Sequence, residues 1–384
     1  MTDTPTIVFL GTHGQHNIGD ELLLETFLHQ LGPTHRYVIN SYDTDATSAQ
    51  LAGRYDAELI DTAGDRLALL RHLLGADALV FGGGSIVKEL YASIGRNRYA
   101  TLLMILAVIT FARHVARVPI AMLNIGVGPI TTPVGKQLAR LILRQADLVT
   151  VRDPGSHALC TALGLGDIVR SGTDAAFSVS AEWLLGGAAH ARRPDDRVRI
   201  ALNLNRDIEN QANWEHFQQV LAESLRAVAE HRPIEVHGLP MQSRGKELDD
   251  ATMLRQFAAR IPEIPFVEHR PQTHEEAARL IARCDLIVSE RLHAIVMASI
   301  VGVPSYVLAY DVKVHELAGM LGFDEATVDI NGPLDAATMT EGILRLLVDL
   351  DAAGTRVSAS AGRLATRADA DFAAARSWLA ERVA

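Results

Sequence analysis

The stretch Ser289–Lys313, SERLHAIVMASIVGVPSYVLAYDVK, decides the fold. Directly before it, Asp285-Leu-Ile-Val288 is a short run with β-branched residues, which predicts a buried strand. The long apolar run that follows predicts a helix ending near Gly302-Val-Pro304, and Ser305–Ala309 predicts a second strand. Together these elements form a strand–helix–strand unit, the repeating element of an open parallel sheet.

Polar side chains gather where both strands of this unit end. Glu290-Arg291-Leu292-His293 follows the first strand, and Tyr310-Asp311-Val312-Lys313 follows the second. In open parallel sheets ligands bind at this edge, where helix N-termini offer backbone N–H groups to anions. The arginine, histidine and lysine therefore predict an anionic ligand and a proton transfer.

The alternation of strand and helix patterns runs through most of the chain and predicts an α/β protein with two Rossmann-like parallel-sheet domains facing a cleft. The pattern breaks into Gly, Ala, Arg and Pro around Ser178–Asp196. We therefore place one domain at residues 1–180 and the other at residues 197–355. Residues 356–384 are expected to contain a C-terminal helix, starting near Arg363, that packs back on the first domain.

Composition limits the classes of function. With 384 residues, of which 48% are hydrophobic, the chain is long enough for two domains with sizeable cores. The net charge of −10 provides no basic field for nucleic acid, so we expect no nucleic-acid partner. Cys160 and Cys284 lack the spacing of a metal site and are expected to be buried thiols. The start, Met1-Thr-Asp-Thr-Pro5, does not read as a signal peptide, so we expect a cytoplasmic protein.

Glycine-rich turns follow the first strands. Gly14-Gln-His-Asn17-Ile-Gly19-Asp20 is either a substrate loop, in which Asn17 or Asp20 holds a hydroxyl group, or a tight turn capped by Asp20. Gly82-Gly83-Gly84-Ser85 is either an anion or sugar site, with Ser85 as the direct contact, or a flexible turn.

Three further polar positions stand after predicted strands. Arg152 could reach the same edge, although Asp153-Pro154 beside it is also an ordinary helix start. Asn205 and Arg206 follow the first strand of the second half, and Asp174 either lines the cleft or fixes the segment between domains.

His293 is the sharpest candidate, because an imidazole suits proton donation near neutral pH and this one stands in the first turn of a helix after a strand. The alternative is a histidine satisfied within the core. Arg291 could form a bidentate pair with a carboxylate or phosphate, or an ion pair with Glu290. Lys313 would add a point charge for the same anion. The chain has no HExxH, CxxC, P-loop or GxSxG motif, and we expect no metal and no cofactor.

Tyr99–Ala112, YATLLMILAVITFA, is almost uniformly apolar and has Arg96 and Arg98 before it and Arg113 and Arg117 after it. It is shorter than the roughly 20 residues of a spanning helix. It is either a helix buried against the sheet or a peripheral contact with anionic lipid through its basic flanks.

These motifs resemble the polysaccharide pyruvyl transferase family. The resemblance covers residues 7–325, and its most specific segment is Ser289-Glu290-Arg291-Leu292-His293-Ala294. It is also carried, in the same order along the chain, by Gly14-x-x-Asn17-x-Gly19-Asp20, Gly82-Gly83-Gly84-Ser85, Gly126-x-Gly128-Pro129, Arg152-Asp153, Asp174, Gly302-Val303-Pro304 and Tyr310-x-x-Lys313.

The resemblance implies a GT-B-like fold and an enzyme that moves the enolpyruvyl group of phosphoenolpyruvate onto a sugar diol, forming a cyclic ketal and releasing phosphate. The acceptor would be a cell-envelope polysaccharide or exopolysaccharide, or a lipid-linked precursor that brings the enzyme to the inner face of the membrane. The expected donor-binding residues are Arg291, Leu292, His293, Lys313, Arg206 and Arg152. The expected acceptor or cleft residues are Asn17, Asp20, Gly83, Gly84, Ser85, Asn205 and Asp174. His293, Arg291 and Asp20 are the expected catalytic residues, with His293 as proton donor and Asp20 as general base.

Two alternatives stay open. A nucleotide-sugar glycosyltransferase would have the same architecture and would need a carboxylate to hold the ribose, for which Glu316 is the candidate. A non-catalytic relative could retain the set of cations to bind a sugar or anion.

Overall fold

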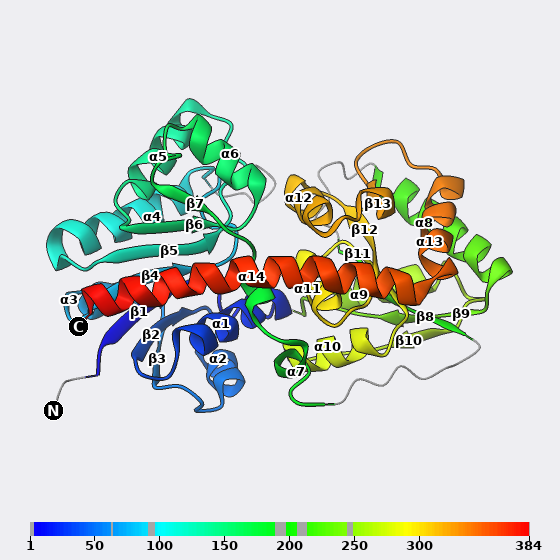
Figure 1. Cartoon of the computed structure of the whole chain (residues 1–384), viewed down its shortest axis with the longest axis horizontal. Coiled ribbons are helices and arrows are strands. Elements are labelled where there is room, and N and C mark those ends of the chain that lie inside the picture. Colours follow the sequence, from blue (N-terminus) through cyan, green and yellow to red (C-terminus); the bar gives the residue numbers. More distant parts are fainter. Residues whose placement is uncertain are drawn as a thin grey trace. The chain divides into compact units, whose positions relative to one another are not determined.

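A computed structural model of the chain describes residues 4–62, 64–90, 97–188, 197–205, 213–243 and 249–383. The chain forms two compact units (Figure 1). The N-terminal unit contains Met1–Gln15, Asp20–Ser178 and Leu364–Ala384, and the C-terminal unit contains His16–Gly19 and Val179–Arg363. Four residues of the first loop thus belong with the second sheet, and the end of the chain belongs with the first.

The sheet of the N-terminal unit has, among the described residues, seven strands in the order β3-β2-β1-β4-β5-β6-β7. Every pairing is parallel. The order of the strands along the sheet therefore reverses between β1 and β4, as in doubly wound nucleotide-binding sheets. The strands are β1 (Thr6–Leu10), β2 (Arg36–Ser41), β3 (Ala57–Asp61), β4 (Ala78–Gly82), β5 (Ile120–Ile125), β6 (Leu148–Val151) and β7 (Val169–Ser171).

Helices cover both faces of this sheet. On one face α3, α4 and α5 share an apolar core with the strands, as Leu73, Ile105 and Ile142 illustrate. On the other face Phe27 of α1 contacts both Phe9 of β1 and Phe372 of the last helix, with ring centroids 5.4 and 5.2 Å apart. The helical elements are α1 (Ile18–Leu31), α2 (Thr44–Leu51), α3 (Arg66–Leu74), α4 (Ala100–Phe111), η2 (Ala112–Ala116), α5 (Pro133–Leu143), α6 (Pro154–Ala162) and η3 (Ala175–Ser178).

The C-terminal unit repeats this plan with, in its described part, six parallel strands in the order β10-β9-β8-β11-β12-β13. Its strands are β8 (Val198–Asn203), β9 (Ile234–Gly238), β10 (Phe266–Glu268), β11 (Leu286–Ser289), β12 (Ser305–Ala309) and β13 (Thr327–Asp329). Its helical elements are α7 (Ala181–Leu184), α8 (Asn213–His231), α9 (Asp250–Ala258), α10 (His274–Ala282), α11 (Leu292–Ile300), α12 (Val312–Leu321), η4 (Asp324–Ala326) and α13 (Ala336–Val348). The helix α14 (Leu350–Arg382) begins in this unit and ends in the N-terminal unit.

The predicted α/β class with two parallel sheets is confirmed. The strand expected at Ser305–Ala309 has the predicted bounds. Short strands were missed, among them β7 and β10, because three residues carry too little pattern to be read. The expectation that the final helix starts near Arg363 was wrong, since α14 starts at Leu350.

Cys160 and Cys284 are buried free thiols, as predicted. Burial raises the pKa of each thiol to about 12, which keeps both protonated at neutral pH. In the described part of the chain, no helix combines the length and apolar character needed to cross a membrane.

A buried carboxyl joins the end of α14 to the first sheet. Asp371 Oδ2 accepts hydrogen bonds from Asn124 Nδ2 at 2.7 Å and from the Thr173 amide at 3.3 Å. Burial raises the pKa of Asp371 to about 6, although the hydrogen bond from Asn124 acts in the opposite direction. The folded state therefore binds a proton at Asp371 more tightly than the unfolded chain does.

We predict that Asp371→Asn changes the pH dependence of stability. A carboxyl whose pKa is raised by folding makes the protein less stable as the pH rises. The loss begins near the pKa of the unfolded chain, about 4, and continues through the pKa of the folded state, about 6. Asparagine keeps an acceptor oxygen and cannot ionise. The free energy of unfolding of the variant, relative to that of the wild type, should therefore increase by about 1–2 kcal/mol when the pH is raised from about 4 to about 8. Denaturation curves at both pH values measure this difference, and an equal difference at both would contradict it.

Candidate functional site

The candidate site lies at the point where the strand order of the second sheet reverses. Strands β8 and β11 are neighbours there, and Asn203 at the end of β8 pairs in register with Ser289 at the end of β11. In open α/β sheets the crevice beyond such a pair of strands is where ligands bind. The segment that decides the fold, Ser289–Lys313, therefore begins at this position.

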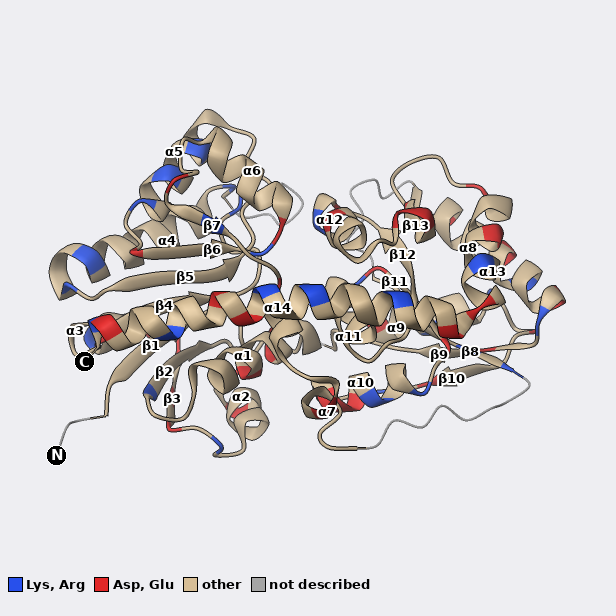
Figure 2. Cartoon of the chain, in the orientation of Figure 1, with Lys and Arg blue, Asp and Glu red and all other residues tan. Residues whose placement is uncertain are grey.

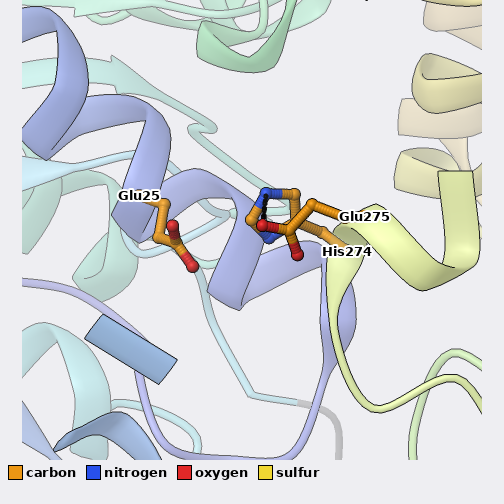
Figure 3. Close-up of side chains that lie close together, drawn as sticks. All are labelled: Glu25, His274 and Glu275. Carbon is orange, nitrogen blue, oxygen red and sulfur yellow. Dashed lines mark ion pairs between the residues drawn. The ribbon is translucent and has the colours of Figure 1, made fainter. Parts of the chain in front are cut away.

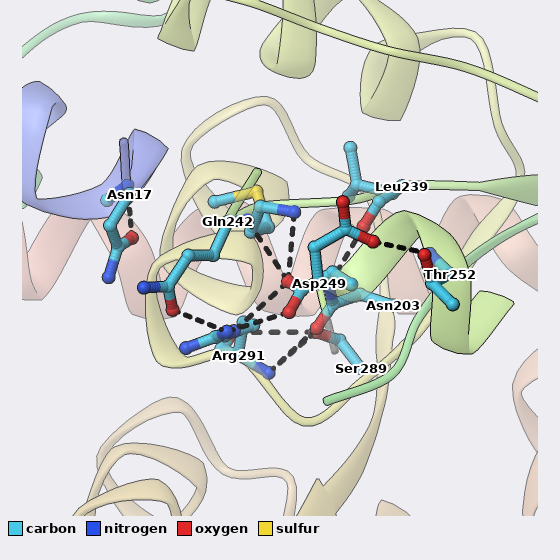
Figure 4. A network of polar contacts seen from close by, with 11 residues as sticks. Asn17, Asn203, Leu239, Gln242, Asp249, Thr252, Ser289 and Arg291 are labelled. Carbon is cyan, nitrogen blue, oxygen red and sulfur yellow. Dashed lines mark hydrogen bonds and ion pairs between the residues drawn. The ribbon is translucent and has the colours of Figure 1, made fainter. Parts of the chain in front are cut away.

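Arg291 occupies the centre of a polar network (Figure 4). Its guanidinium donates to Asp250 through Nη2, at 2.8 Å from Oδ1, and through Nε, at 3.3 Å from Oδ2. Nη2 also donates to Gln242 Oε1 at 3.0 Å. The Arg291 side chain is 11% exposed and that of Asp250 is 1% exposed, so this is a bidentate ion pair largely removed from water. The partner of Arg291 is thus Asp250, where the sequence had suggested Glu290.

Asp250 is the anchor of this network. Beyond Arg291, its Oδ2 accepts from the backbone amides of Met241 and Gln242, both at 3.1 Å. Asn203 Nδ2 lies 3.5 Å from the same oxygen. A buried carboxylate is stable only when paired and hydrogen-bonded in this way. Asp250 therefore ties α9, the loop after β9 and the start of α11 together.

The backbone around Arg291 is held as firmly as its side chain. The Arg291 amide donates to Asn203 Oδ1 at 3.2 Å and to Ser289 Oγ at 3.1 Å. Asn203 is itself fixed, because its Nδ2 donates to the Leu239 carbonyl at 2.8 Å. The start of α11 is consequently a rigid feature at the end of two buried strands.

The N-terminus of α11 lacks a side-chain cap. Arg291 is its N-cap residue and makes no side-chain capping bond. By contrast, Asp249 caps α9 by accepting from the Thr252 amide, Thr273 caps α10, and Asp311 caps α12. The positive end of the helix dipole therefore lies at a helix start where the N-cap side chain makes no capping bond. Leu292 and His293, both half-buried, stand in this first turn.

The segment His16–Gly19 packs against the same helix start. Asn17 pairs with Gln242 in an antiparallel bridge, and the Ile18 amide donates to the Met241 carbonyl at 2.9 Å. Gly19 lies against the imidazole, because a Cβ at this position would stand 2.8 Å from the Cβ of His293 and overlap its ring. Asn17 Oδ1 accepts from the Gly19 amide at 3.0 Å and so shapes this turn. The predicted residue Asn17 is thus brought to the network around Arg291.

Two more predicted residues stand at this edge. Lys313, in the first turn of α12, forms an ion pair with Asp311 at 2.9 Å and has a side chain that is 28% exposed. Asn205 follows β8 and is 1% exposed. The predicted residue Arg206 lies outside the described residues.

The edge of the first sheet carries the remaining predicted residues. Arg152, which is 6% exposed, donates to Ser85 Oγ at 2.9 Å and to Asp174 Oδ2 at 3.4 Å. Asp153 Oδ2 lies 3.6 Å from Arg152 Nε, and Asp153 also caps α6 through the Ser156 amide, as its sequence predicted. Arg152, Ser85 and Asp174 are therefore brought together, and the charge of the arginine is balanced by two carboxylates.

Glycine is required in the turn after β4. Gly83 and Gly84 have φ values of 63° and 68°, a conformation that side chains disfavour. The hydrogen bond from the Gly126 amide to the Gly84 carbonyl, at 2.7 Å, holds this turn against the end of β5. The turn is ordered, and it sets the position of Ser85 beside Arg152.

Two titratable residues, His13 in the first loop and Glu21 in the first turn of α1, were missed by the sequence analysis. His13 is 1% exposed and stacks on Phe9, and burial lowers the pKa of its imidazole to about 3. Burial and the neighbouring charge of Asp20 raise the pKa of Glu21 to about 8, against the effect of a hydrogen bond from the Gly14 amide. At neutral pH the histidine is neutral and the glutamic acid is protonated. Asp20 itself is the third residue of α1 and belongs to the N-terminal unit.

Figure 3 draws three acidic and histidine side chains that belong to different units. In the C-terminal unit, His274 stacks on Trp183 with ring centroids 5.2 Å apart, and its Nε2 lies 3.7 Å from Glu275 Oε1. In the N-terminal unit, Glu25 accepts a hydrogen bond from Gln50 at 3.1 Å and forms an ion pair with Arg54. The buried side chains of His274 and Glu25 thus each have partners within their own unit.

Asp250 and Gln242 were also missed by the sequence analysis. Asp249-Asp250 resembles an ordinary helix start, and Asp249 does cap α9. Nothing in the local pattern separates the second aspartate from the first. The signal that distinguishes them is tertiary, because only Asp250 faces the arginine that lies 41 residues later.

Comparison with known proteins gives one family. A family model described as polysaccharide pyruvyl transferase matches residues 17–312. This range includes Asn17, the network around Arg291 and the first turn of α11. No curated protein matches the chain.

Solved structures show the same fold at low sequence identity. A putative UDP-N-acetylglucosamine 2-epimerase from Listeria monocytogenes has a TM-score of 0.63 and 14% identity, with 98% of this chain and 97% of that chain covered. UDP-GlcNAc 2-epimerase from Neisseria meningitidis has a TM-score of 0.62 and 12% identity, with 96% and 98% covered. A glycosyltransferase from Rickettsia africae has a TM-score of 0.57 and 11% identity, with 96% and 94% covered. The fold is therefore the GT-B-like one expected from the sequence.

We predict that the two adjacent aspartates of α9 differ strongly in their contribution to stability. Asp250→Ala leaves Arg291 buried without its counter-charge and should cost about 3–5 kcal/mol. Asp249→Ala removes only a helix cap and should cost about 1 kcal/mol. Chemical denaturation of both variants measures the difference. Equal losses would show that the buried ion pair does not hold this site together.

We also predict that Gly19→Ala displaces the imidazole of His293, because the added methyl group would overlap the ring. The NMR signals of the His293 ring should shift. Gly75→Ala is the matched control, since a Cβ at Gly75 meets no atom within 4 Å. Unchanged His293 signals in the Gly19 variant would contradict the contact.

Proposed function

Since the chain belongs to the polysaccharide pyruvyl transferase family, we propose that it transfers the enolpyruvyl group of phosphoenolpyruvate onto a sugar diol. The product is a cyclic pyruvate ketal on a cell-envelope polysaccharide, an exopolysaccharide or a lipid-linked precursor, and phosphate is released. Both the acceptor class and the donor are proposed from the family, and the cations and helix start of the C-terminal unit support an anionic donor.

The observation that carries the proposal is the start of α11. A helix N-terminus without a side-chain cap stands at the switch point of the second sheet, with Arg291 as its N-cap and His293 in its first turn. Phosphoenolpyruvate carries a carboxylate and a phosphate, and such anions bind backbone N–H groups at helix N-termini. His293 supplies a proton donor at the same place.

Arg291 and Lys313 are proposed to contribute differently to donor binding, because their side chains differ in exposure. The charge of Arg291 is largely balanced by Asp250, so its main contribution is to fix the helix start and to line the donor site. Lys313 is more exposed and lies at the end of the neighbouring strand β12. The positive end of the α11 dipole and the ammonium of Lys313, which is paired with Asp311, then provide most of the attraction for the donor. Arg206 and Arg152 remain further candidates for its charges.

The proposed reaction consists of acid–base steps. His293 protonates the methylene carbon of the enol, which becomes a methyl group and leaves a cationic centre at the adjacent carbon. One sugar hydroxyl attacks that carbon and loses its proton, and the carbon–oxygen bond to phosphate breaks. A second hydroxyl attacks the same carbon, loses its proton and closes the ketal ring. These steps involve no change of oxidation state, and we propose that they need no metal or redox cofactor.

The acceptor is proposed to contact glycine turns and polar side chains that follow strands of the two sheets. Asn17, Gly83, Gly84, Ser85, Asp174 and Asn205 are the candidate contacts, and Asp20 is the candidate general base. Ser85 and Asp174 are already oriented by Arg152, so these contacts would be preorganised. A lipid-linked acceptor would require the enzyme to work at the inner face of a membrane.

The proposal predicts that His293→Ala lowers the rate of acceptor-dependent phosphate release from phosphoenolpyruvate by about 10²-fold, as expected for loss of a general acid. His216→Ala is the control, because His216 is exposed on α8.

Lys313→Met should weaken binding of phosphoenolpyruvate, measured by titration calorimetry, while Asp249→Ala leaves it unchanged.

The same assay distinguishes glycosyl transfer. The chain shares its fold with enzymes whose names include UDP-GlcNAc, so a panel of sugar nucleotides is run beside phosphoenolpyruvate with the same acceptors. Release of nucleoside diphosphate without release of phosphate from phosphoenolpyruvate would overturn the proposal. Binding of phosphoenolpyruvate without turnover on any acceptor would indicate a non-catalytic relative.

A further inference from the structure

One surface of the N-terminal unit combines exposed apolar side chains with basic charge. Five of the eleven large apolar side chains that are exposed among the described residues lie between residues 103 and 141: Leu103, Met104, Val115, Val134 and Leu141. Their exposed fractions range from 44% to 59%. We call the surface formed by α4, η2 and α5 the α4–α5 surface.

The two helices of this surface lie side by side and run in the same direction. Tyr99 Oη donates to Thr132 Oγ1 at 3.1 Å beside their first turns, and Gln145 Nε2 donates to Thr110 Oγ1 at 3.2 Å near their last turns. Both helices contribute their inner faces to the same core. Their outer faces therefore belong to one continuous surface.

The outer face of α4 is an apolar stripe. Ala100, Leu103, Met104, Ala107 and Phe111 recur at helical spacing, and none of them is fully buried. On α5, Leu141 stands one turn before Gln145, which contacts the end of α4. The sequence had left open whether Tyr99–Ala112 is a helix buried against the sheet or a peripheral contact with anionic lipid. The structure shows a helix with one buried face and one exposed face.

The charge of the α4–α5 surface is opposite to that of the whole chain. From residue 90 to residue 146 the sequence has no Asp or Glu and seven Lys or Arg, in a protein whose net charge is −10. These are Arg96, Arg98, Arg113, Arg117, Lys136, Arg140 and Arg144, of which Arg96 lies outside the described residues. Figure 2 marks Lys and Arg along α5 and at the end of α4. Of these, Arg113 is paired with Asp147 at 2.8 Å, whereas Arg117, Lys136 and Arg144 are exposed.

We propose that the α4–α5 surface binds the surface of an anionic lipid bilayer. An exposed apolar stripe flanked by cations is the pattern of segments that lie in the membrane interface, with apolar side chains in the acyl boundary and cations at anionic headgroups. Charge complementarity selects this partner. A second copy of the same surface would bring like charges together, whereas an anionic bilayer offers acyl chains to the apolar stripe and negative headgroups to its flanking cations.

Vesicle flotation with the full-length protein tests the proposal. The protein should float with vesicles of phosphatidylcholine and phosphatidylglycerol, should float poorly with phosphatidylcholine alone, and should be released by high salt. The charge variant Arg117→Gln/Lys136→Gln/Arg144→Gln should bind on the order of 100-fold more weakly, from about fivefold for each charge at an anionic surface. The matched control Arg356→Gln/Arg363→Gln/Arg367→Gln removes three exposed arginines of α14 and should bind like the wild type.

A second variant tests the apolar stripe. Leu103→Ser/Met104→Ser changes exposed positions and should keep the fold, yet should lower vesicle binding at any salt concentration. Equal binding of both vesicle types, or equal losses in the charge variant and its control, would overturn the proposal. So would a wild-type dimer in sedimentation that Leu103→Ser/Met104→Ser converts to a monomer without any binding to vesicles, because the surface would then join two copies. The assay involves no catalysis, so its result is independent of the proposed pyruvyl transfer.

Discussion

The buried ion pair between Arg291 and Asp250 is the interaction on which the candidate site depends. Each charge alone would be costly to remove from water. The pair is stable because Asp250 also accepts two backbone amides, from Met241 and Gln242. Gln242 in turn pairs with Asn17 of the first loop. One carboxylate thereby fixes the start of α11, the loop after β9 and the segment that contacts His293, so these parts are expected to lose their order together.

The same device recurs at the edge of the first sheet. Arg152 follows β6 as Arg291 follows β11, and each is held by a buried aspartate, Asp174 in one case and Asp250 in the other. An arginine balanced in this way orients its neighbours more than it attracts an anion. In the proposed donor site, attraction for the anion is therefore assigned mainly to the start of α11 and to Lys313, which is more exposed than Arg291 although it pairs with Asp311.

The membrane inference and the proposed reaction concern different units of the chain. The candidate donor site lies at the carboxyl edge of the second sheet, whereas the α4–α5 surface covers one face of the first sheet. A polysaccharide precursor carried on a lipid would make both features useful to one enzyme. Each nevertheless rests on its own observations, namely an uncapped helix start in one case and an acid-free basic stretch with exposed apolar residues in the other.

The sequence by itself determined the α/β class, most strand positions and the family, because strand and helix periodicity and the Ser289–Ala294 segment are local patterns. It also pointed to Arg291 and His293 through their place after a strand. Only the tertiary structure decided the partner of Arg291 and brought Gly19 against His293. It also identified which face of α4 is exposed. These facts depend on contacts between residues far apart in the sequence; Asp250 and Arg291, for example, are 41 positions apart. No local pattern records which of two adjacent aspartates faces an arginine, and only packing selects one.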